Sequence, residues 1–273
     1  MARILITGSN SGFGKLAALN LARSGHDVIA TMRNPSHADA LLAEAEGFSL
    51  QVRTLDVCDS ESVDAALHDA ITIDVVVNNA GYEVQSAVEQ LTDEILLRQL
   101  DTNVVGPMRC IRAVMPEWRK RGSGVIVNVS SIAGRVGSPY AGAYSASKFG
   151  LEGMTESLHF EVSTAGIRVH LIEPGSFATG FQDKIVRPDS WSGSIFEERA
   201  HQFRDARGAL HDPSAPAPDP QEVADAIVRA ATDPSMPFRT LVGSDAQLID
   251  NVKSSMSFED FETAMRTTLD WHD

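Results

Sequence analysis

The sequence predicts a doubly wound α/β fold, with a parallel seven-stranded sheet and helices on both of its faces. Three observations lead to this prediction. Strand-like and helix-like stretches alternate from residue 3 onward, a glycine-rich turn follows the first strand, and several strands are largely apolar. Such alternation is typical of βαβ units, and apolar strands are typical of sheets that helices cover on both faces. We expect one domain over residues 1–273.

The strands are expected where short apolar runs lie between turn residues. They cover residues 3–7, 27–32, 49–57, 73–79, 124–131, 167–175 and 239–243. The run at 49–57 alternates in the manner of a strand, whereas the three consecutive valines at 75–77 indicate a strand buried on both faces.

The first two helices are expected from their start and stop signals. The first follows the glycine turn and ends at Gly25. Asn34 and Pro35 read as the N-cap and the first residue of the second helix, and Gly47 as its stop.

A capping residue and two prolines indicate where the next helices begin and where they are interrupted. Asp59 or Ser60 caps a third helix that runs to about residue 70. A long helical stretch follows over 92–121, and Pro107 and Pro116 are expected to break or kink it, because proline lacks the N–H that a helix interior needs.

The regular alternation lapses between residues 180 and 220. Within this insert, residues 196–206 have helical character, and SAPAPDP at 214–220 reads as a loop. We expect the insert to be a lid over a site rather than a second domain. A terminal helix follows residue 257, with four apolar residues on one face. These are Phe258, Phe261, Met265 and Leu269.

Composition excludes several classes of function. The net charge of −14 and the pI near 4.9 argue against nucleic acid or an anionic membrane as a partner. No apolar run approaches the roughly 20 residues that span a bilayer, and MARILITG reads as a strand start rather than a signal peptide. Cys58, Cys110 and the eight scattered histidines show no metal-ligand spacing. We expect a cytoplasmic protein without a metal.

The glycine turn TGSNSGFG predicts a nucleotide site. A strand that enters a helix through glycines places backbone N–H groups and the positive end of the helix at one point, where a pyrophosphate can bind. Gly8, Gly12 and Gly14 have the spacing GxxxGxG and not GxGxxG. Tight packing alone is the alternative explanation of these glycines.

The end of the second strand indicates which dinucleotide is preferred. An acidic residue there accepts the ribose 2′-OH of NAD, whereas an arginine accommodates the 2′-phosphate of NADP. In ATMRNP, Met32 stands where the acid would be and Arg33 follows it. The sequence therefore favours NADP(H), although a solvated Arg33 is the alternative.

YSASK places Tyr144 one helical turn before Lys148, with small residues between them, on a long helix expected over 143–162. Side chains at i and i+4 share a helix face, and a neighbouring ammonium favours the phenolate of a tyrosine whose ordinary pKa is about 10. The alternative is a solvated pair.

Six motifs in order make the chain resemble the short-chain dehydrogenase/reductase family in its single-domain form, over about two-thirds of its length. They are TGSNSGFG, NNAG (78–81), Asn103, VNVSS (127–131), YSASK and EPGSFAT (173–179). The resemblance implies a Rossmann fold and an NAD(P)-dependent enzyme that interconverts a carbonyl and a secondary alcohol.

The resemblance also implies catalytic roles. Tyr144 would be the general acid in reduction and the general base in oxidation. Lys148 would lower the pKa of Tyr144 and hydrogen-bond the nicotinamide ribose. Ser131, thirteen residues before the tyrosine, would donate to the substrate oxygen, while Ser130 would face away. Asn103 would hold a water that relays protons to Lys148.

The cofactor contacts carried over from the family form a larger set, while Asn78 is expected to pin the fourth strand. The set is Gly8, Asn10, Gly12, Phe13, Gly14, Arg33, Asp56, Val57, Asn79, Ala80, Gly81, Tyr144, Lys148, Pro174, Gly175, Phe177 and Thr179.

The substrate is expected to be a small, lipophilic ketone or alcohol, because several apolar residues are candidates for a pocket under the lid. They are Tyr82, Val84, Val136, Tyr140, Phe181, Trp191, Phe196 and Phe203. Ordinary packing is the alternative for each. A silent NADP(H)-binding sensor or scaffold, and an epimerase or dehydratase of the longer branch, are the competing functions.

The resemblance further implies a homodimer or homotetramer that pairs through helices at about 103–121 and 144–164. Four residues of the second helix would serve either that interface or the core. They are Gly150, Leu151, Met154 and Leu158.

Overall fold

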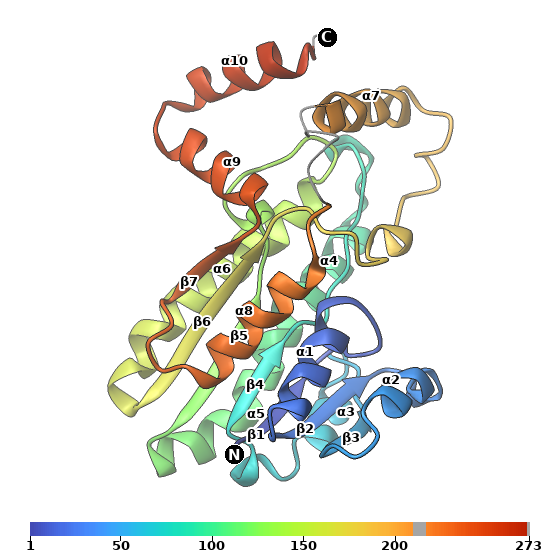
Figure 1. Cartoon of the computed structure of the whole chain (residues 1–273). Coiled ribbons are helices and arrows are strands. Elements are labelled where there is room, and N and C mark those ends of the chain that lie inside the picture. The colour runs from blue at the N-terminus through green and yellow to red at the C-terminus, as the bar shows by residue number, and fades with distance from the viewer. Residues whose placement is uncertain (210–216, 272–273) are drawn as a thin grey trace.

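A computed structural model describes residues 1–209 and 217–271, and within them seven parallel strands form one sheet (Figure 1). The strands are β1 (Arg3–Ile6), β2 (Asp27–Met32), β3 (Leu50–Thr54), β4 (Val75–Asn78), β5 (Gly124–Val129), β6 (Ile167–Pro174) and β7 (Arg239–Val242). Their order is β3-β2-β1-β4-β5-β6-β7, so the direction of winding reverses between β1 and β4. The predicted fold class is confirmed. Ligands of doubly wound sheets bind outside the carboxyl ends of the strands at such a reversal.

The α-helices alternate with the strands until β4 and again after β5. They are α1 (Gly12–Arg23), α2 (Asp39–Glu44), α3 (Ser60–Ala66), α4 (Asp93–Leu100), α5 (Gly106–Arg121), α6 (Gly142–Val162), α7 (Ile195–Ala209), α8 (Pro220–Thr232), α9 (Ser244–Ser254) and α10 (Phe258–Leu269).

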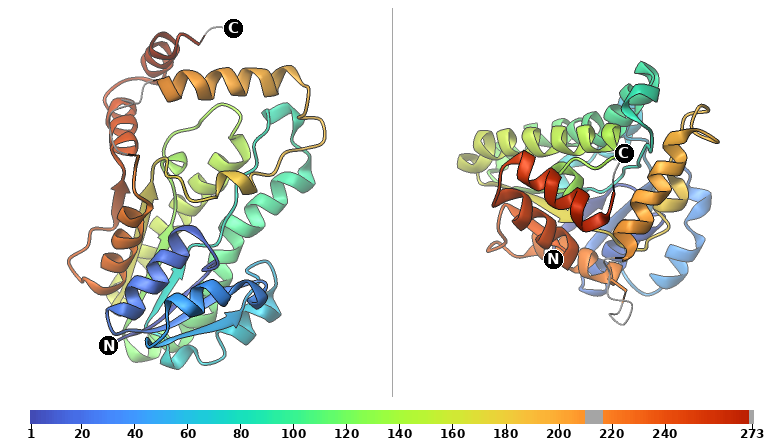
Figure 2. Two further views of the ribbon diagram at one scale, coloured as in Figure 1. Left: turned by 45° about the vertical axis from the view of Figure 1, so that its right-hand side comes forward. Right: turned by 90° about the horizontal axis from the view of Figure 1, so that it is seen from above.

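Helices cover both faces of the sheet and create two apolar cores. On one face α1 packs beside α8 (Figure 2), and Ile4 and Ile6 of β1 are buried beneath them. Leu5 points to the other face, where it packs with residues of α3 and α5 such as Val63 and Trp118. This division follows from the two-residue period of a strand. Because both faces are covered, the central strand β4 carries three consecutive buried valines.

The helical stretch at 92–121 differs from the expectation at one of its two prolines. A π-helical turn, Asp101–Val105, joins α4 to α5, and Pro107 stands in the first turn of α5, where its missing N–H costs nothing. Pro116 lies inside α5 without ending it. Its ring is on the exposed side, while Val114 and Trp118 on the opposite side are fully buried. We attribute the continuity of α5 to this burial, which offsets the lost backbone hydrogen bond.

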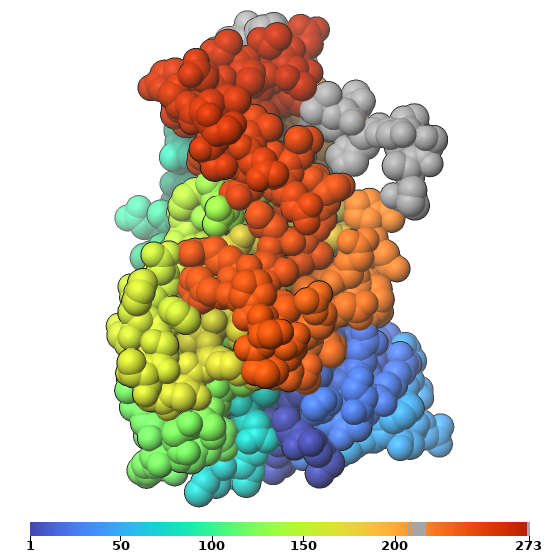
Figure 3. Space-filling model, turned by 60° about the vertical axis from the view of Figure 1, so that its left-hand side comes forward, coloured from blue at the N-terminus to red at the C-terminus, as the bar shows by residue number. Residues whose placement is uncertain are grey.

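The C-terminal helices gather at the carboxyl end of the sheet. Figure 3 shows their residues, in red, at the opposite end of the molecule from the N-terminal strand. The predicted terminal helix is present as α10, with Phe261 and Leu269 buried and Phe258 exposed. Among the described residues, no helix is both long and apolar enough to cross a bilayer.

The loop predicted at 214–220 falls partly outside the described residues, because 210–216 are not described. Its last residue, Pro220, begins α8 and is not part of a loop. Asp219 caps that helix, since its carboxylate accepts from the N–H of Gln221 at 2.9 Å. Proline is favoured at such a first helical position.

Candidate active site

One cavity of about 1740 Å³ lies at the carboxyl ends of the strands. It runs from the glycine turn after β1, past Tyr144 on α6, to α7 and α10. All but two of the residues predicted to bind cofactor or to act in catalysis line it; Gly14 and Asn103 do not. The cavity is therefore long enough to hold a dinucleotide at one end and a second molecule at the other.

The glycine turn is held in one shape by Asn79. Its side-chain amide donates to the carbonyl oxygens of Thr7 and Gly8, at 3.0 and 3.1 Å. Gly8 has φ +70°, and a Cβ atom there would lie 2.9 Å from the Cα of Ala80. Gly12 has φ +58°. Side chains are excluded from this turn by conformation and by space, so the chain is suited to close contact with a pyrophosphate.

Arg33, Asp56 and Val57 line the cavity near the ends of β2 and β3. Arg33 is exposed at the end of β2, directly after the buried Met32. The carboxylate of Asp56 accepts from the N–H of Cys58 at 3.0 Å, which shapes the turn after β3. One basic and one acidic residue, Arg33 and Asp56, therefore lie at this end of the cavity.

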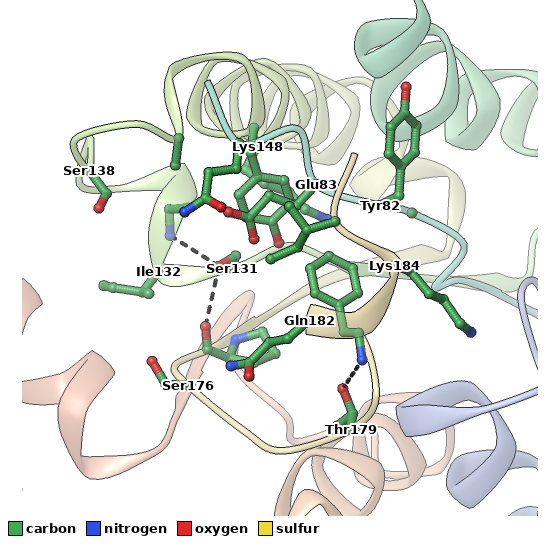
Figure 4. Close-up of a pocket in the computed structure, with 18 of the residues that line it drawn as sticks. Tyr82, Glu83, Ser131, Ile132, Ser138, Lys148, Ser176, Thr179, Gln182 and Lys184 are labelled. Atoms are coloured by element: carbon green, nitrogen blue, oxygen red, sulfur yellow. Dashed lines mark hydrogen bonds between the residues drawn. The ribbon is translucent and has the colours of Figure 1, made fainter. Parts of the chain in front are cut away.

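Tyr144 and Lys148 face each other on α6 (Figure 4 shows Lys148 and Ser131). The Lys148 Nζ lies 5.6 Å from the centre of the Tyr144 ring and donates to the carbonyl oxygen of Val129 at 2.9 Å. Burial lowers the pKa of Lys148 to about 8, and the charge of Glu152 opposes this. Burial in an apolar cavity disfavours the charged form of an amine.

The pKa of Tyr144 is raised well above 10, first by burial and then by the negative charge of Glu83. A hydrogen bond with Ser131 acts in the opposite direction. In the cofactor-free protein, therefore, Tyr144 is a phenol that holds its proton over the physiological pH range.

Ser131 is the serine that reaches Tyr144. Its hydroxyl accepts from the N–H of Ala133 at 3.1 Å and donates to the carbonyl oxygen of Pro174 at 3.5 Å (dashed in Figure 4). This places Ser131 between Tyr144 and the end of β6. The Ser130 hydroxyl is buried, and a Cβ atom at Gly134 would lie 2.9 Å from it.

Asn103 lies in the π-helical turn and is buried. Its amide nitrogen donates to the Tyr82 carbonyl and the Ser147 hydroxyl, both at 3.0 Å, and its oxygen accepts from the N–H of Tyr82. The side chain thus fixes the loop after β4 beside Lys148. A water held here would have to use groups other than the two amide hydrogens.

The structure separates the apolar pocket candidates into two groups. Five line the cavity, namely Tyr82, Val136, Tyr140, Phe181 and Phe203. Val84, Trp191 and Phe196 are not among the residues that line it, and for Val84 and Trp191 the alternative of ordinary packing holds. Val84 is buried in a short β-bridge with Val186, and Trp191 is buried with its ring edge-on to Tyr140 at 6.1 Å. Both therefore pack inside the protein instead of facing the cavity.

Several cavity residues were not identified from the sequence. Glu83 follows β4 and lies close enough to Tyr144 to raise its pKa. Lys184 reaches the cavity from the lid, and Arg204 and Arg266 line it from α7 and α10. These residues belong to no sequence motif. They reach the cavity only because folding brings together segments that are distant in the sequence.

Comparison with known proteins shows the family of the chain. A sequence model described as short chain dehydrogenase matches residues 2–190. The chain belongs to this family. As a short-chain dehydrogenase it is an oxidoreductase that acts on alcohol and carbonyl groups, as its named relatives do.

Three of these relatives show how much of the chain the family resemblance covers. A 3-ketodihydrosphingosine reductase of Bacteroides thetaiotaomicron is 38% identical, over 90% of this chain and 89% of its own. Human retinol dehydrogenase 8 is 36% identical, over 86% and 79%. A short-chain dehydrogenase structure from Streptomyces avermitilis is 33% identical with a TM-score of 0.80, and covers 98% of this chain and 100% of its own.

Proposed function

We propose that this short-chain dehydrogenase interconverts a lipophilic ketone and a secondary alcohol with NADP(H). One observation carries the proposal: Tyr144, Lys148 and Ser131 meet in the middle of the cavity, between the glycine turn and an apolar chamber. A reacting carbonyl there lies between a nucleotide site and a substrate site. Bound nicotinamide supplies or accepts the hydride.

The side chains account for the proton chemistry. In reduction, negative charge develops on the substrate oxygen, and the Tyr144 hydroxyl delivers a proton to it. The Lys148 ammonium stabilises the resulting phenolate through its charge, since it is charged below its pKa of about 8. Ser131 donates a hydrogen bond to the same oxygen once its weak 3.5 Å bond to Pro174 is given up.

Residues at the end of β2 support NADP(H) over NAD(H). Met32 is buried where a carboxylate would select the free ribose hydroxyl, and Arg33 is exposed at the cavity rim. His37 lines the same rim. A 2′-phosphate meets a positive charge there and no neighbouring acid on the strand end.

The far end of the cavity supports a lipophilic substrate. Its roof is built from α7 and α10, which are joined by an edge-on contact of Phe203 with Trp271 at 5.3 Å. The apolar roof residues are Phe203, Phe258, Phe261, Met265, Leu269 and Trp271, and three charged residues line the same part of the cavity, namely Arg204, Glu262 and Arg266. The names of the two curated relatives, a ketodihydrosphingosine reductase and a retinol dehydrogenase, agree with this choice.

We also propose that the protein is a homodimer or homotetramer, paired through the helices at 103–121 and 144–164. Leu151 is buried in the subunit itself and so does not serve the interface. Phe149 and Phe160 on α6 are exposed, at 44% and 73%. A monomer by light scattering at micromolar concentration contradicts this assembly.

A series of methyl ketones of increasing chain length tests the substrate class. We expect kcat/KM with NADPH to rise with each added CH₂ until the chamber is filled, because each buried CH₂ contributes about 0.8 kcal/mol. Phe261→Ala is the matched variant, since it enlarges the roof without touching Tyr144, and it should move the optimum to longer chains. A flat profile, or a preference for short polar ketones, contradicts the proposal.

A further inference from the structure

The lid turn η7 (Gln182–Lys184) reaches across the cavity to the glycine turn. Lys184 Nζ donates to the hydroxyl of Ser11 at 2.8 Å, between residues 173 apart in the sequence. Figure 4 shows Lys184 extending from the lid toward the N-terminal part of the chain, drawn in blue. The contact joins the C-terminal lid to the start of α1.

Ser11 does not use its side chain as a helix cap. It is the N-cap residue of α1, yet its hydroxyl accepts nothing from the helix and instead receives the Lys184 hydrogen bond. A serine in this position ordinarily accepts from the N–H two or three residues on. The first-turn N–H groups of α1 therefore have no side-chain acceptor from their own cap.

Lys184 brings a positive charge to the start of α1. The first turn of α1 contains no acidic residue, and its Lys15 is already paired with Glu44 at 2.7 Å. Among the ion pairs of residues 1–209 and 217–271, none involves Lys184. An ammonium that forms no ion pair among the described residues thus lies at the positive end of a helix.

The same lid segment also touches the catalytic residues. The Thr179 side chain lies 3.5 Å from where a Cβ atom of Gly12 would be, and its hydroxyl accepts from the N–H of Phe181. The Phe181 ring centre is 6.1 Å from that of Tyr144. Whatever fixes Lys184 therefore also holds the lid segment over the tyrosine.

We propose that Lys184 binds a phosphate of the dinucleotide at the N-terminal end of α1, and so fixes the lid segment over Tyr144 when the cofactor is bound. This inference rests on the proposed function for the identity of the ligand. On binding, the ammonium exchanges the Ser11 hydroxyl for a phosphate oxygen, which is a charged and therefore stronger acceptor.

The test is cofactor binding without any substrate. We expect Lys184→Met to raise the Kd for NADPH roughly 10-fold, as loss of one charged hydrogen bond does, and to flatten its dependence on salt. Lys184→Arg, which keeps the charge, should restore most of the affinity. Lys120→Met is the matched control, because Lys120 is an exposed lysine paired with Glu117 at the far end of α5.

Comparison with NADH identifies the phosphate. If Lys184→Met loses affinity equally for NADPH and NADH, the contact is with the pyrophosphate. If it loses affinity for NADPH alone, the contact is with the 2′-phosphate. A folded Lys184→Met protein with unchanged Kd for both cofactors, at low and high salt, overturns the inference. Because no carbonyl is present, a protein that binds NADPH through Lys184 but reduces no ketone would refute the proposed function and leave this inference intact.

Discussion

Lys148 lies four residues after Tyr144 on α6, with its ammonium 5.6 Å from the centre of the phenol ring. The tyrosine is buried, its pKa is raised, and the carboxylate of Glu83 raises it further. In the proposed mechanism the ammonium of Lys148 favours the phenolate that remains after proton transfer, whereas burial and Glu83 disfavour it. The geometry predicts how each of these groups affects turnover.

Tyr144→Phe should abolish catalysis while leaving cofactor binding nearly unchanged. In the proposed mechanism the hydroxyl is the proton donor, and a general acid contributes about 100-fold to 10,000-fold to a rate. The ring, which packs near Phe181, is retained. Steady-state kinetics together with NADPH titration measure the two effects separately, and a variant that keeps its kcat removes Tyr144 from the mechanism.

Glu83→Gln should shift alcohol oxidation to lower pH. Oxidation needs the Tyr144 phenolate as base, and the negative charge of Glu83 disfavours that phenolate. Removal of the charge lowers the pKa of Tyr144, so the rise of log kcat/KM with pH should begin at a lower pH than in the wild type. An unmoved profile would show that Glu83 has no influence on the tyrosine.

Arg33→Ala should weaken NADPH binding and leave NADH binding as it is. Arg33 stands exposed at the cavity rim, where only NADP carries a phosphate. Arg23→Ala, at the opposite end of α1, is the control. If Arg33→Ala binds NADPH as tightly as the wild type does, another residue selects the cofactor.

The free energy of unfolding should fall as pH rises, because Glu173 is protonated in the folded protein. Glu173 is fully buried on β6 with Arg239 at 3.4 Å, and burial together with the charge of Glu152 raises its pKa from 4.5 to about 8. Between pH 4.5 and about 8, Glu173 is therefore protonated in the folded protein and ionised in the unfolded chain. The contribution of Glu173 to the free energy of unfolding is therefore full below pH of about 4.5 and is lost as pH rises through about 8.

Urea unfolding over this pH range measures the effect, since each unit of pKa corresponds to about 1.4 kcal/mol. Glu173→Gln is neutral at every pH and should give a flatter profile. Glu156→Gln is the control, because Glu156 also pairs with Arg239 but is exposed. Equal slopes in the wild type and Glu173→Gln would show that Glu173 is ionised when folded.

Local sequence was enough to predict the sheet and the centre of the site. Three signals are local: the valines of β4, the glycine turn and the Tyr144–Lys148 spacing. Each can be recognised from a short stretch of sequence, so the prediction from it does not depend on the rest of the fold. Pro116 is expected to break or kink the helix, but α5 continues through it. We attribute this to the tertiary burial of Trp118, which outweighs the local cost of the proline.

The remaining features depend on contacts that local patterns do not encode. Lys184 meets Ser11 across 173 residues, and Arg135 joins Asp250 of α9 across 115. Glu83 sits in a loop that carries no motif, and its effect on Tyr144 follows from the packing of that loop against α6. Such contacts form only when folding brings distant segments of the chain together.

The most direct test of the account is to titrate the purified protein with NADPH and NADH by fluorescence, and then to follow NADPH absorbance after adding a panel of lipophilic ketones. We predict tighter binding of NADPH than of NADH, and NADPH consumption with at least one ketone, matched by the alcohol formed and absent in Tyr144→Phe. Tight NADPH binding without turnover of any ketone would contradict the proposed catalytic function and favour a cofactor-binding sensor.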